Sequence, residues 1–389
     1  MTSTVFTDID WDKDGKQIGT LNLPHSPDDD AWGVIPFPAA SIKNGKGPVV
    51  VLTGAVHGDE YEGPIVISEL MRNIEAQEVT GQLILLPTFN APALKAGRRT
   101  SPIDQLNLNR VFPGDDYGLP TQQIARYVTD HLFSKANFYI DLHAGGRSLF
   151  IQPSAHVVMA EGMPAELIQA NARLAEAFGV GITVQTSNMG DYRTSAGYVT
   201  FKGIPMLAAE MGMGGWATAD SVRATREATH RVLKHTGVLP NIETCPGEKT
   251  QWTRIHGTEA YVFAPMDGYF ERHFALGDEI QKGQVAGLMH HLNRPNLEPE
   301  AVYFQSSGTL YAHARPHDRR LLASLGTALA RVDQALESFS RPLLKRSLKW
   351  DLSQALWIEA LDSENDALIK SERDKQAAAG IQPIEFSAA

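Results

Sequence analysis

Cysteine is nearly absent from this sequence: Cys245 is the only one, so no internal disulfide can form. A chain without disulfides is typical of a reducing compartment, and we therefore expect a cytoplasmic protein. Positive charge is also scarce, since 35 lysines and arginines face 45 aspartates and glutamates, for a formal net charge of -10. Nucleic acids and anionic membranes need a basic face on their partners, so we expect neither as a partner.

Long apolar runs are missing as well. No stretch reaches the ~18 consecutive apolar residues of a membrane-spanning helix. The first residues, MTSTVFTDIDWDKDGKQ, are acidic and lack the apolar core of a secretory signal. We therefore expect neither a membrane span nor a secretory signal. The oligomeric state stays open, a homo-oligomer included.

The 389 residues, 43% of them hydrophobic, are typical of a globular protein with more than one domain. Continuous apolar runs at 48–54 and 82–89 and a third run within 136–146 alternate with helix-like segments. This alternation predicts an α/β fold, a mixed and mainly parallel sheet flanked by helices. Near residue 240 the pattern changes to short strands and turns. We expect a catalytic domain at 1–245, a small β-rich domain at 246–338 and a helical tail of unknown role at 339–389.

Two buried runs end in histidines, which predicts a metal site. The first run ends in Gly54-Ala55-Val56-His57-Gly58-Asp59-Glu60, and the second in Asp141-Leu142-His143. Ligands in open α/β sheets bind at the carboxyl ends of strands, so these side chains should meet there. Two histidines and a carboxylate are the ligands of a hydrolytic zinc site, although cobalt or manganese could substitute. Asp141, or alternatively Asp59, would orient an imidazole.

A hydrolytic metal site also needs a base and positive charge for the substrate. The apolar strand IPMLAAE ends at Glu210, and a carboxylate in that place is costly unless it works or is paired. We therefore predict that Glu210 is the general base. The segment AGRRTSPIDQLNLNR supplies Arg98, Arg99 and Arg110 as cations. Arg110, beside Asn109, suits a clamp on a substrate carboxylate, because guanidinium groups bind carboxylates in a bidentate manner.

Four motifs in this order resemble the succinylglutamate desuccinylase and aspartoacylase family of the zinc carboxypeptidase clan. They are HGDEYEG, LNLNRVFPG, DLHAGG and AAEMG, and the resemblance covers roughly residues 15–335. It implies a zinc-dependent amidohydrolase with one zinc ion per chain and a C-terminal β-domain that narrows the entrance. The implied substrate is a small N-acyl amino acid.

Site residues are carried over on the positions that match these motifs. The resemblance implies zinc ligation by His57, Glu60 and His143, catalysis by Glu210, a grip on the substrate α-carboxylate by Asn109 and Arg110, and polarisation of the scissile carbonyl by Arg99. Arg98 remains the alternative to Arg99 in the last of these roles.

Within the family, the segments SPIDQLNLNRVFPGD and TSNMGDYRTSAGYVTFKGIP are most similar to deacetylases that act on Nα-acetyl-L-2,4-diaminobutyrate in ectoine degradation. Such a substrate carries a side-chain ammonium, so we expect an unpaired acid in the pocket, which the sequence does not identify. The alternatives are an aspartoacylase or desuccinylase, a metallocarboxypeptidase, or a metal-binding protein without activity.

Overall fold

The computed structural model describes residues 3–186, 191–255 and 257–314, which form two compact units. The first unit runs from the N-terminus to Ala260 and also takes in residues 275–281 and 306–314. The second consists of residues 261–274 and 282–305. No helix among the described residues is both long and apolar enough to cross a membrane.

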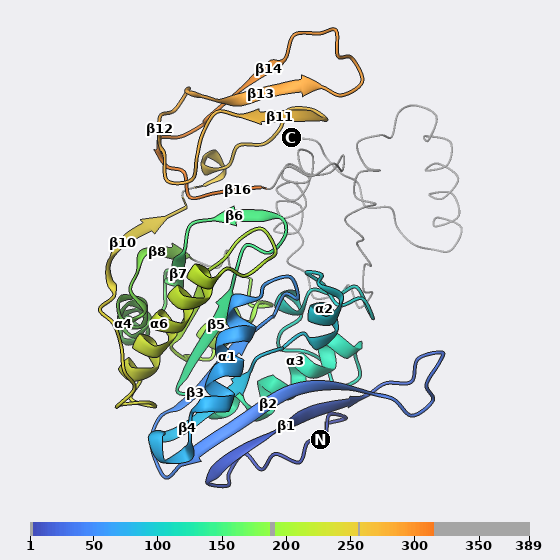
Figure 1. Ribbon diagram of the computed structural model, residues 1–389, viewed down its shortest axis with the longest axis vertical. Coiled ribbons are helices and arrows are strands. Elements are labelled where there is room, and N and C mark those ends of the chain that lie inside the picture. Colours follow the sequence, from blue (N-terminus) through green and yellow to red (C-terminus); the bar gives the residue numbers. More distant parts are fainter. Residues whose placement is uncertain (1–2, 187–190, 256, 315–389) are drawn as a thin grey trace. The chain divides into compact units, whose positions relative to one another are not determined.

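A nine-stranded sheet organises the first unit (Figure 1). The strand order is β1-β2-β4-β3-β5-β9-β7-β8-β10. The strands are β1 (Gly15–Pro24), β2 (Val34–Asn44), β3 (Val49–Gly54), β4 (Gly81–Leu86), β5 (Phe138–His143), β7 (Ser154–Val158), β8 (Val180–Thr186), β9 (Met206–Glu210) and β10 (Glu248–Arg254). Neighbours run antiparallel in the β1–β2, β2–β4 and β7–β9 pairs and parallel in the others.

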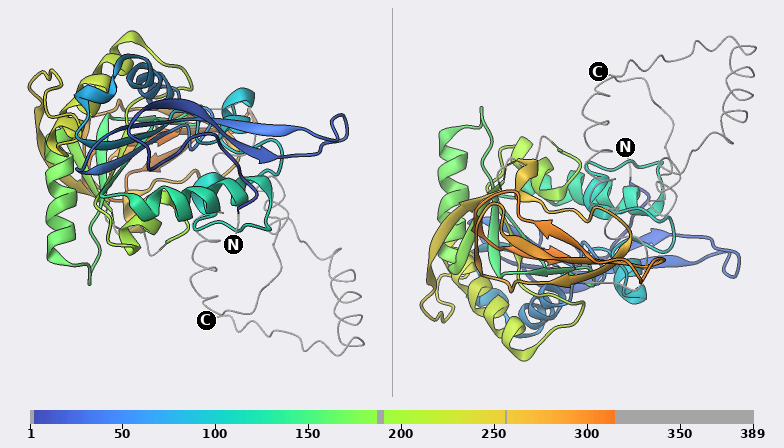
Figure 2. Two further views of the ribbon diagram at one scale, coloured as in Figure 1. Left: turned by 90° about the horizontal axis from the view of Figure 1, so that it is seen from below. Right: turned by 90° about the horizontal axis from the view of Figure 1, so that it is seen from above.

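Helices cover both faces of this sheet and bury two apolar clusters. One face packs against α1 (Glu62–Asn73), α4 (Ala165–Phe178) and α6 (Ala219–His235). The opposite face packs against α3 (Pro120–His131) and α5 (Ser195–Phe201), and Figure 2 shows α1 and α3 on opposite sides of the sheet. Alternate residues of β3 enter the two clusters, since side chains along a strand point to opposite faces. The predicted α/β class, with a mixed and mainly parallel sheet flanked by helices, is confirmed.

Shorter elements complete the first unit. They are α2 (Ala91–Ala96), β6 (Leu149–Ile151), β12 (Glu279–Ile280), β15 (Gly308–Thr309), β16 (Ala312–Ala314) and 3-10 helices at Ala76–Glu78, Leu108–Arg110, Phe133–Lys135 and Thr258–Ala260. β16 pairs with β6 and β12 pairs with β15, both antiparallel. Through these pairs, residues 306–314 return to the first unit after the chain has formed the second.

The second unit is an antiparallel sheet of three strands, β11 (Gly268–Arg272), β13 (Val285–His291) and β14 (Glu300–Tyr303), with β13 in the middle. Rings of Phe270, Phe274 and Phe304 pack together in this unit. The predicted domain limits at 245 and 338 stay predictions. However, β10 pairs with β8, so the large sheet continues beyond residue 245. The predicted tail, 339–389, lies outside the described residues.

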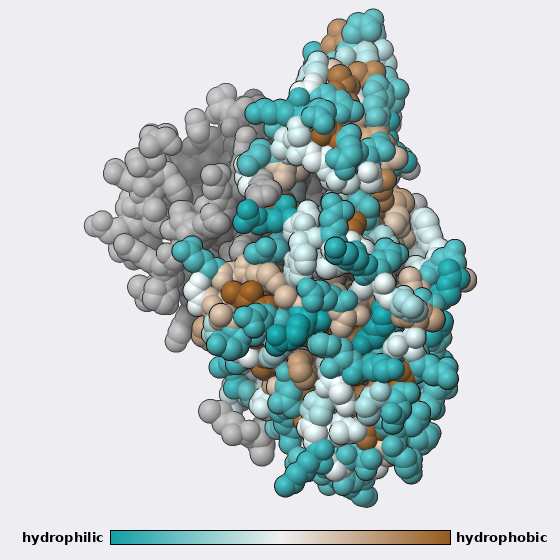
Figure 3. All heavy atoms as spheres, turned by 90° about the vertical axis from the view of Figure 1, so that its left-hand side faces the viewer, coloured by the Kyte–Doolittle hydropathy of each residue, from teal (hydrophilic) through white to brown (hydrophobic). Residues whose placement is uncertain are grey.

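The described surface in Figure 3 is mostly hydrophilic, and hydrophobic side chains appear there in small separate groups. Apolar side chains scattered in this way are ordinary on a folded protein and mark no partner by themselves.

Candidate metal centre and active site

A tight loop between β3 and α1 carries the first two candidate ligands, His57 and Glu60. The loop is closely packed: a Cβ atom added to Gly58 would lie only 2.0 Å from the carbonyl carbon of Ala93 in α2. Where the loop enters α1, a Cβ atom on Gly63 would lie 2.7 Å from the carbonyl oxygen of Leu142 in β5. These two glycines let the loop lie directly against α2 and β5, so its side chains are held at the carboxyl end of β5.

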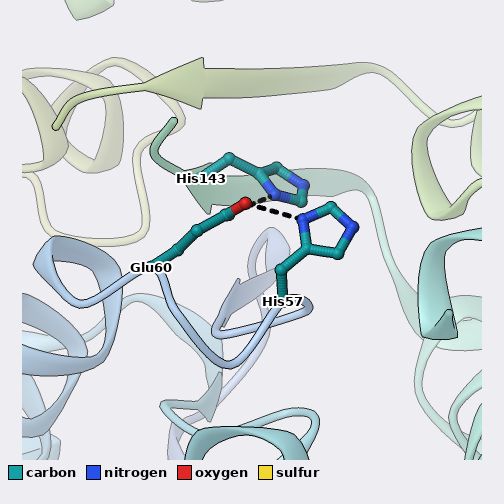
Figure 4. Close-up of side chains that lie close together, drawn as sticks. All are labelled: His57, Glu60 and His143. Atoms are coloured by element: carbon teal, nitrogen blue, oxygen red, sulfur yellow. Dashed lines mark hydrogen bonds and ion pairs between the residues drawn. The ribbon is translucent and has the colours of Figure 1, made fainter. Parts of the chain in front are cut away.

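Three side chains converge there, as Figure 4 shows. Nδ1 of His57 lies 2.7 Å from Oε1 of Glu60, and Nδ1 of His143 lies 2.8 Å from Oε2 of the same carboxylate. One ligand atom from each residue lies within 4.8 Å of the others. The three are 3%, 2% and 7% exposed, respectively. The structure therefore brings together the three residues that the sequence predicted as metal ligands.

The electrostatics of this group suit a bound cation. Burial by itself would raise the pKa of Glu60, but the interactions of this carboxylate with the rings of His57 and His143 hold that pKa below its ordinary value. Burial lowers the pKa of His57 to about 4, which keeps this imidazole neutral and able to ligate a metal. Burial alone would lower the pKa of His143, but the negative charges of Asp141 and Glu60 hold that pKa well above its ordinary value, so a bound metal would replace the proton of this ring. Two imidazole nitrogens and a carboxylate oxygen, without a thiolate, form a donor set that fits zinc.

Asp141, rather than Asp59, contacts a candidate ligand. Its Oδ2 lies 2.9 Å from Nε2 of His143, so the far nitrogen of this ring can donate to a carboxylate while Nδ1 faces the centre. Asp59 instead accepts a hydrogen bond from the backbone N–H of Arg147 at 2.9 Å. The alternative that the sequence left open is thus decided by geometry in favour of Asp141.

Ser195, which the sequence analysis did not single out, connects the metal centre to the predicted substrate clamp. Its hydroxyl donates to Oδ2 of Asp141 at 2.9 Å, and its backbone N–H donates to Oδ1 of Asn109 at 2.9 Å. Thr53 donates to the other oxygen of Asp141 at 2.7 Å. Because its carbonyl oxygen is engaged in this way, Asn109 keeps its amide N–H groups for a ligand.

Glu210 ends β9 directly opposite His143 of β5 in the strand register. Its Oε2 is buried and has no hydrogen-bond partner among the described residues. Burial, followed by the negative charge of Glu60, raises the pKa of Glu210 to about 7. A carboxyl group whose pKa lies near neutral pH can both accept and return a proton, as general acid–base catalysis requires.

The predicted cations occupy different places. Nη1 of Arg99 lies 3.4 Å from Oε1 of Glu60, whereas Arg98 donates to Gln105 at 3.4 Å. Geometry therefore favours Arg99 over Arg98 beside the metal centre. Arg110 donates to the backbone oxygen of Asn109 at 2.7 Å, which holds it next to that residue.

A cavity of about 290 Å³ joins these groups. It is lined by His57, Arg99, Asn109, Arg110, His143, His156, Val158, Thr186, Thr194, Ala196, Met206, Ala208 and Glu210. Among these described lining residues, Glu210 is the only carboxylate, so the extra acid expected for a substrate ammonium is not found there. His156 is isolated in its strand and belongs to no motif, so the sequence gives no signal of a role for it.

We predict that Asp141→Asn weakens zinc binding by about 10- to 100-fold, because His143 loses the charged acceptor that orients its ring. Asp59→Asn is the matched control, since the Asp59 side chain contacts neither candidate histidine in the described structure. Competition against a chromophoric chelator measures the affinity, and thermal unfolding of the metal-free proteins checks the fold. Equal zinc affinities of Asp141→Asn and Asp59→Asn would contradict the role of Asp141.

We also predict that Glu210→Gln stabilises the metal-free protein at pH 8. The raised pKa of Glu210 means that folding opposes its ionisation. This cost is absent below pH 4.5, grows between pH 4.5 and about 7, and is fully present above. The gain in free energy of unfolding should reach at most about 3 kcal/mol at pH 8 and shrink towards pH 5. Urea unfolding in chelator measures it, with exposed Glu161→Gln as the control. A gain that does not depend on pH would refute this explanation.

Comparisons with known proteins identify the family of the chain. Residues 46–236 match the succinylglutamate desuccinylase/aspartoacylase catalytic domain. The chain is 34% identical over 338 residues to the N-alpha-acetyl-L-2,4-diaminobutyric acid deacetylase of Halomonas elongata, covering 86% of this chain and 96% of that protein.

Solved structures are similar too. The product-bound ectoine utilization protein EutE (DoeB) of Ruegeria pomeroyi is 35% identical, with a TM-score of 0.77, over 81% of this chain and 95% of that one. A succinylglutamate desuccinylase/aspartoacylase of Rhodobacter sphaeroides is 34% identical, with a TM-score of 0.75, over the same shares. The chain therefore belongs to the succinylglutamate desuccinylase/aspartoacylase family of amidohydrolases.

Proposed function

We propose that this protein removes the acyl group from the α-nitrogen of a small amino acid. The observation that carries the proposal is the place of Glu210, which lines the same cavity as the two histidines of the metal centre and has a buried carboxyl oxygen without a partner among the described residues. A non-catalytic metal protein has no need of a buried, unpaired carboxyl group, which is costly to keep.

The metal that we propose is zinc, one ion per chain, held by His57, Glu60 and His143. When bound, zinc supplies Lewis acidity, which makes an attacking water more acidic and favours negative charge on the amide oxygen. Asp141 fixes the ring of His143 for this purpose through their 2.9 Å contact. The single cysteine supports a cytoplasmic location for this activity.

The protein's own groups would perform the proton transfers. Glu210 takes a proton from the attacking water and returns it to the departing amine, for which a pKa of about 7 is well suited. Arg99, placed beside Glu60, polarises the scissile carbonyl. Asn109 and Arg110 hold the substrate carboxylate, and this grip fixes the geometry of attack.

The substrate that we propose is Nα-acetyl-L-2,4-diaminobutyrate, which would place the protein in ectoine degradation. The similarity to the deacetylase of Halomonas elongata and to the ectoine utilization protein of Ruegeria pomeroyi, each over most of this chain, supports this choice. The cavity of about 290 Å³ also suits a small amino acid better than a peptide.

We predict the order of preference in a panel of four substrates. Zinc-loaded protein is offered Nα-acetyl-2,4-diaminobutyrate, N-acetyl-aspartate, N-succinyl-glutamate and a blocked dipeptide, and release of the free amine is followed. The highest kcat/KM is expected with the first compound. A clear preference for acetyl-aspartate or succinyl-glutamate would contradict the proposed substrate but support the proposed reaction. If no compound releases its amine at full zinc occupancy, the proposed enzymatic activity is refuted.

We predict that Glu210→Gln keeps stoichiometric zinc but lowers kcat by about two to four orders of magnitude, because glutamine cannot accept the proton. Metal content by mass spectrometry and steady-state kinetics measure the two quantities separately. Exposed Glu161→Gln is the control and should keep both. Loss of zinc from Glu210→Gln would show that Glu210 is a ligand, and unchanged turnover would show that another group is the base.

A further inference from the structure

Ser154, His156 and Tyr311 form a hydrogen-bonded cluster beside the cavity. The hydroxyl of Tyr311 lies 2.6 Å from the Ser154 hydroxyl and 2.6 Å from Nε2 of His156. Ser154 is fully buried, and its hydroxyl also lies 3.3 Å from Nε2 of His156. Tyr311 reaches this place because residues 306–314 return to the first unit, where Gln152 of the neighbouring segment donates hydrogen bonds to the backbone oxygens of Leu310 and Tyr311.

The strand register places this cluster across the cavity from the metal centre. Asp141 of β5, Ala208 of β9 and His156 of β7 are neighbours in one row of the sheet. Directly paired residues on adjacent strands share a face, so these three side chains lie on the same face. The side chain of Ala208 is only a methyl group, so it leaves space between the side chains of Asp141 and His156 on this face. Asn109 lies on the Asp141 side of this space, because Ser195 binds both residues.

Counting protons determines how the cluster is arranged. Burial, together with the charge of His143, lowers the pKa of His156 to about 4, so its ring is neutral at pH 7 and carries one N–H. If Ser154 donates to Tyr311 and Tyr311 donates to Nε2, both hydroxyl protons are used and the ring N–H is at Nδ1. In the reverse order Nε2 donates to Tyr311 and Tyr311 donates to Ser154, which leaves the proton of buried Ser154 without an acceptor among the described residues. A buried hydroxyl whose proton has no acceptor is unfavourable, so the first order is favoured.

The Nδ1 atom is available to a ligand. It makes no hydrogen bond with the described residues, because the contacts of the ring with Ser154 and Tyr311 are both at Nε2. His156 lines the cavity, so Nδ1 is the ring nitrogen that remains for a ligand there. A neutral N–H that faces a cavity is suited to an oxygen acceptor rather than to an ammonium group.

We propose that His156 is a specificity-determining residue whose Nδ1–H donates a third hydrogen bond, with Asn109 and Arg110, to the carboxylate of the substrate. Tyr311 is the positioning residue: together with Ser154 it holds His156 in the tautomer that donates. The proposal rests on the proposed function, which places a substrate carboxylate at Asn109 and Arg110.

The first test reads the tautomer without any turnover. Nitrogen-15 NMR of selectively labelled histidine, assigned by comparison with His156→Asn, should show His156 in wild-type protein protonated at Nδ1 and unprotonated at Nε2. Tyr311→Phe, which keeps the ring but removes the hydroxyl, should shift His156 towards a mixture of tautomers. A wild-type ring protonated at Nε2 would overturn the proposal even if the enzyme is active.

The second test measures carboxylate recognition in the zinc-loaded protein. His156→Leu should weaken binding of L-2,4-diaminobutyrate about tenfold, as expected for a hydrogen bond to a charged group. Binding of 1,3-diaminopropane, which lacks the carboxylate, should not change. His156→Asn should weaken binding less than His156→Leu, because the asparagine amide can donate from the position of Nδ1. Equal losses for both ligands would show a merely structural role.

The third test asks whether Tyr311 acts through His156. With the best N-acyl amino acid of the substrate panel, Tyr311→Phe should raise KM about three- to tenfold while kcat changes less than twofold. In a His156→Asn background the same substitution should have no further effect on KM, because no tautomer remains to be set. Additive effects would overturn the positioning role. No turnover of any substrate would refute the proposed function alone, since the tautomer and the binding of the free amino acid would still be measured.

Discussion

The candidate active site depends on a buried carboxylate that must have partners. Glu60 is only 2% exposed and lies within 2.8 Å of a ring nitrogen from each of two histidines. A charge buried to this extent is unfavourable unless it is paired or binds a metal. The loop after β3, the end of β5 and the glycines that let them approach all serve this pairing, and a bound cation would complete it.

The sheet register then places the candidate base beside that centre. Because β5 and β9 are parallel neighbours, His143 and Glu210 are directly opposite each other at their carboxyl ends. One strand thus presents a candidate ligand and the other a candidate base, with no loop between them that could change their spacing. Positions on rigid strands hold catalytic geometry better than positions on loops.

Hydrogen bonds of neutral side chains hold the cavity walls in place on two sides. On one side Ser195 joins Asp141 to Asn109, so a group that orients a candidate metal ligand also orients a candidate substrate donor. On the other side Tyr311 contacts His156. In Asn109 and in His156, the hydrogen bonds engage one end of the side chain and leave the other end for a ligand.

The sequence by itself determined the fold class and the residues that converge at the metal centre. Apolar runs that end in His57, His143 and Glu210 predict strands whose ends meet, because parallel strands align their carboxyl ends at one edge of a sheet. The confirmed sheet and the convergence of these side chains follow that logic, whereas the roles of the site residues remain predictions. Sequence reasoning favoured Asp141 and Arg99 but left Asp59 and Arg98 as alternatives, since a motif does not fix the direction in which a side chain points.

Only the tertiary structure decided which side chains complete the site. Ser195, His156 and Tyr311 lie outside the four family motifs, and each makes a hydrogen bond to a residue far away in the sequence, across 54 positions for Ser195 and Asp141 and 155 for His156 and Tyr311. Contacts of this range arise from strand order and from the return of residues 306–314 to the first unit, and neither is encoded in local pattern or spacing. A motif identifies the candidate ligands and the candidate base, but packing alone determines which neutral side chains surround them.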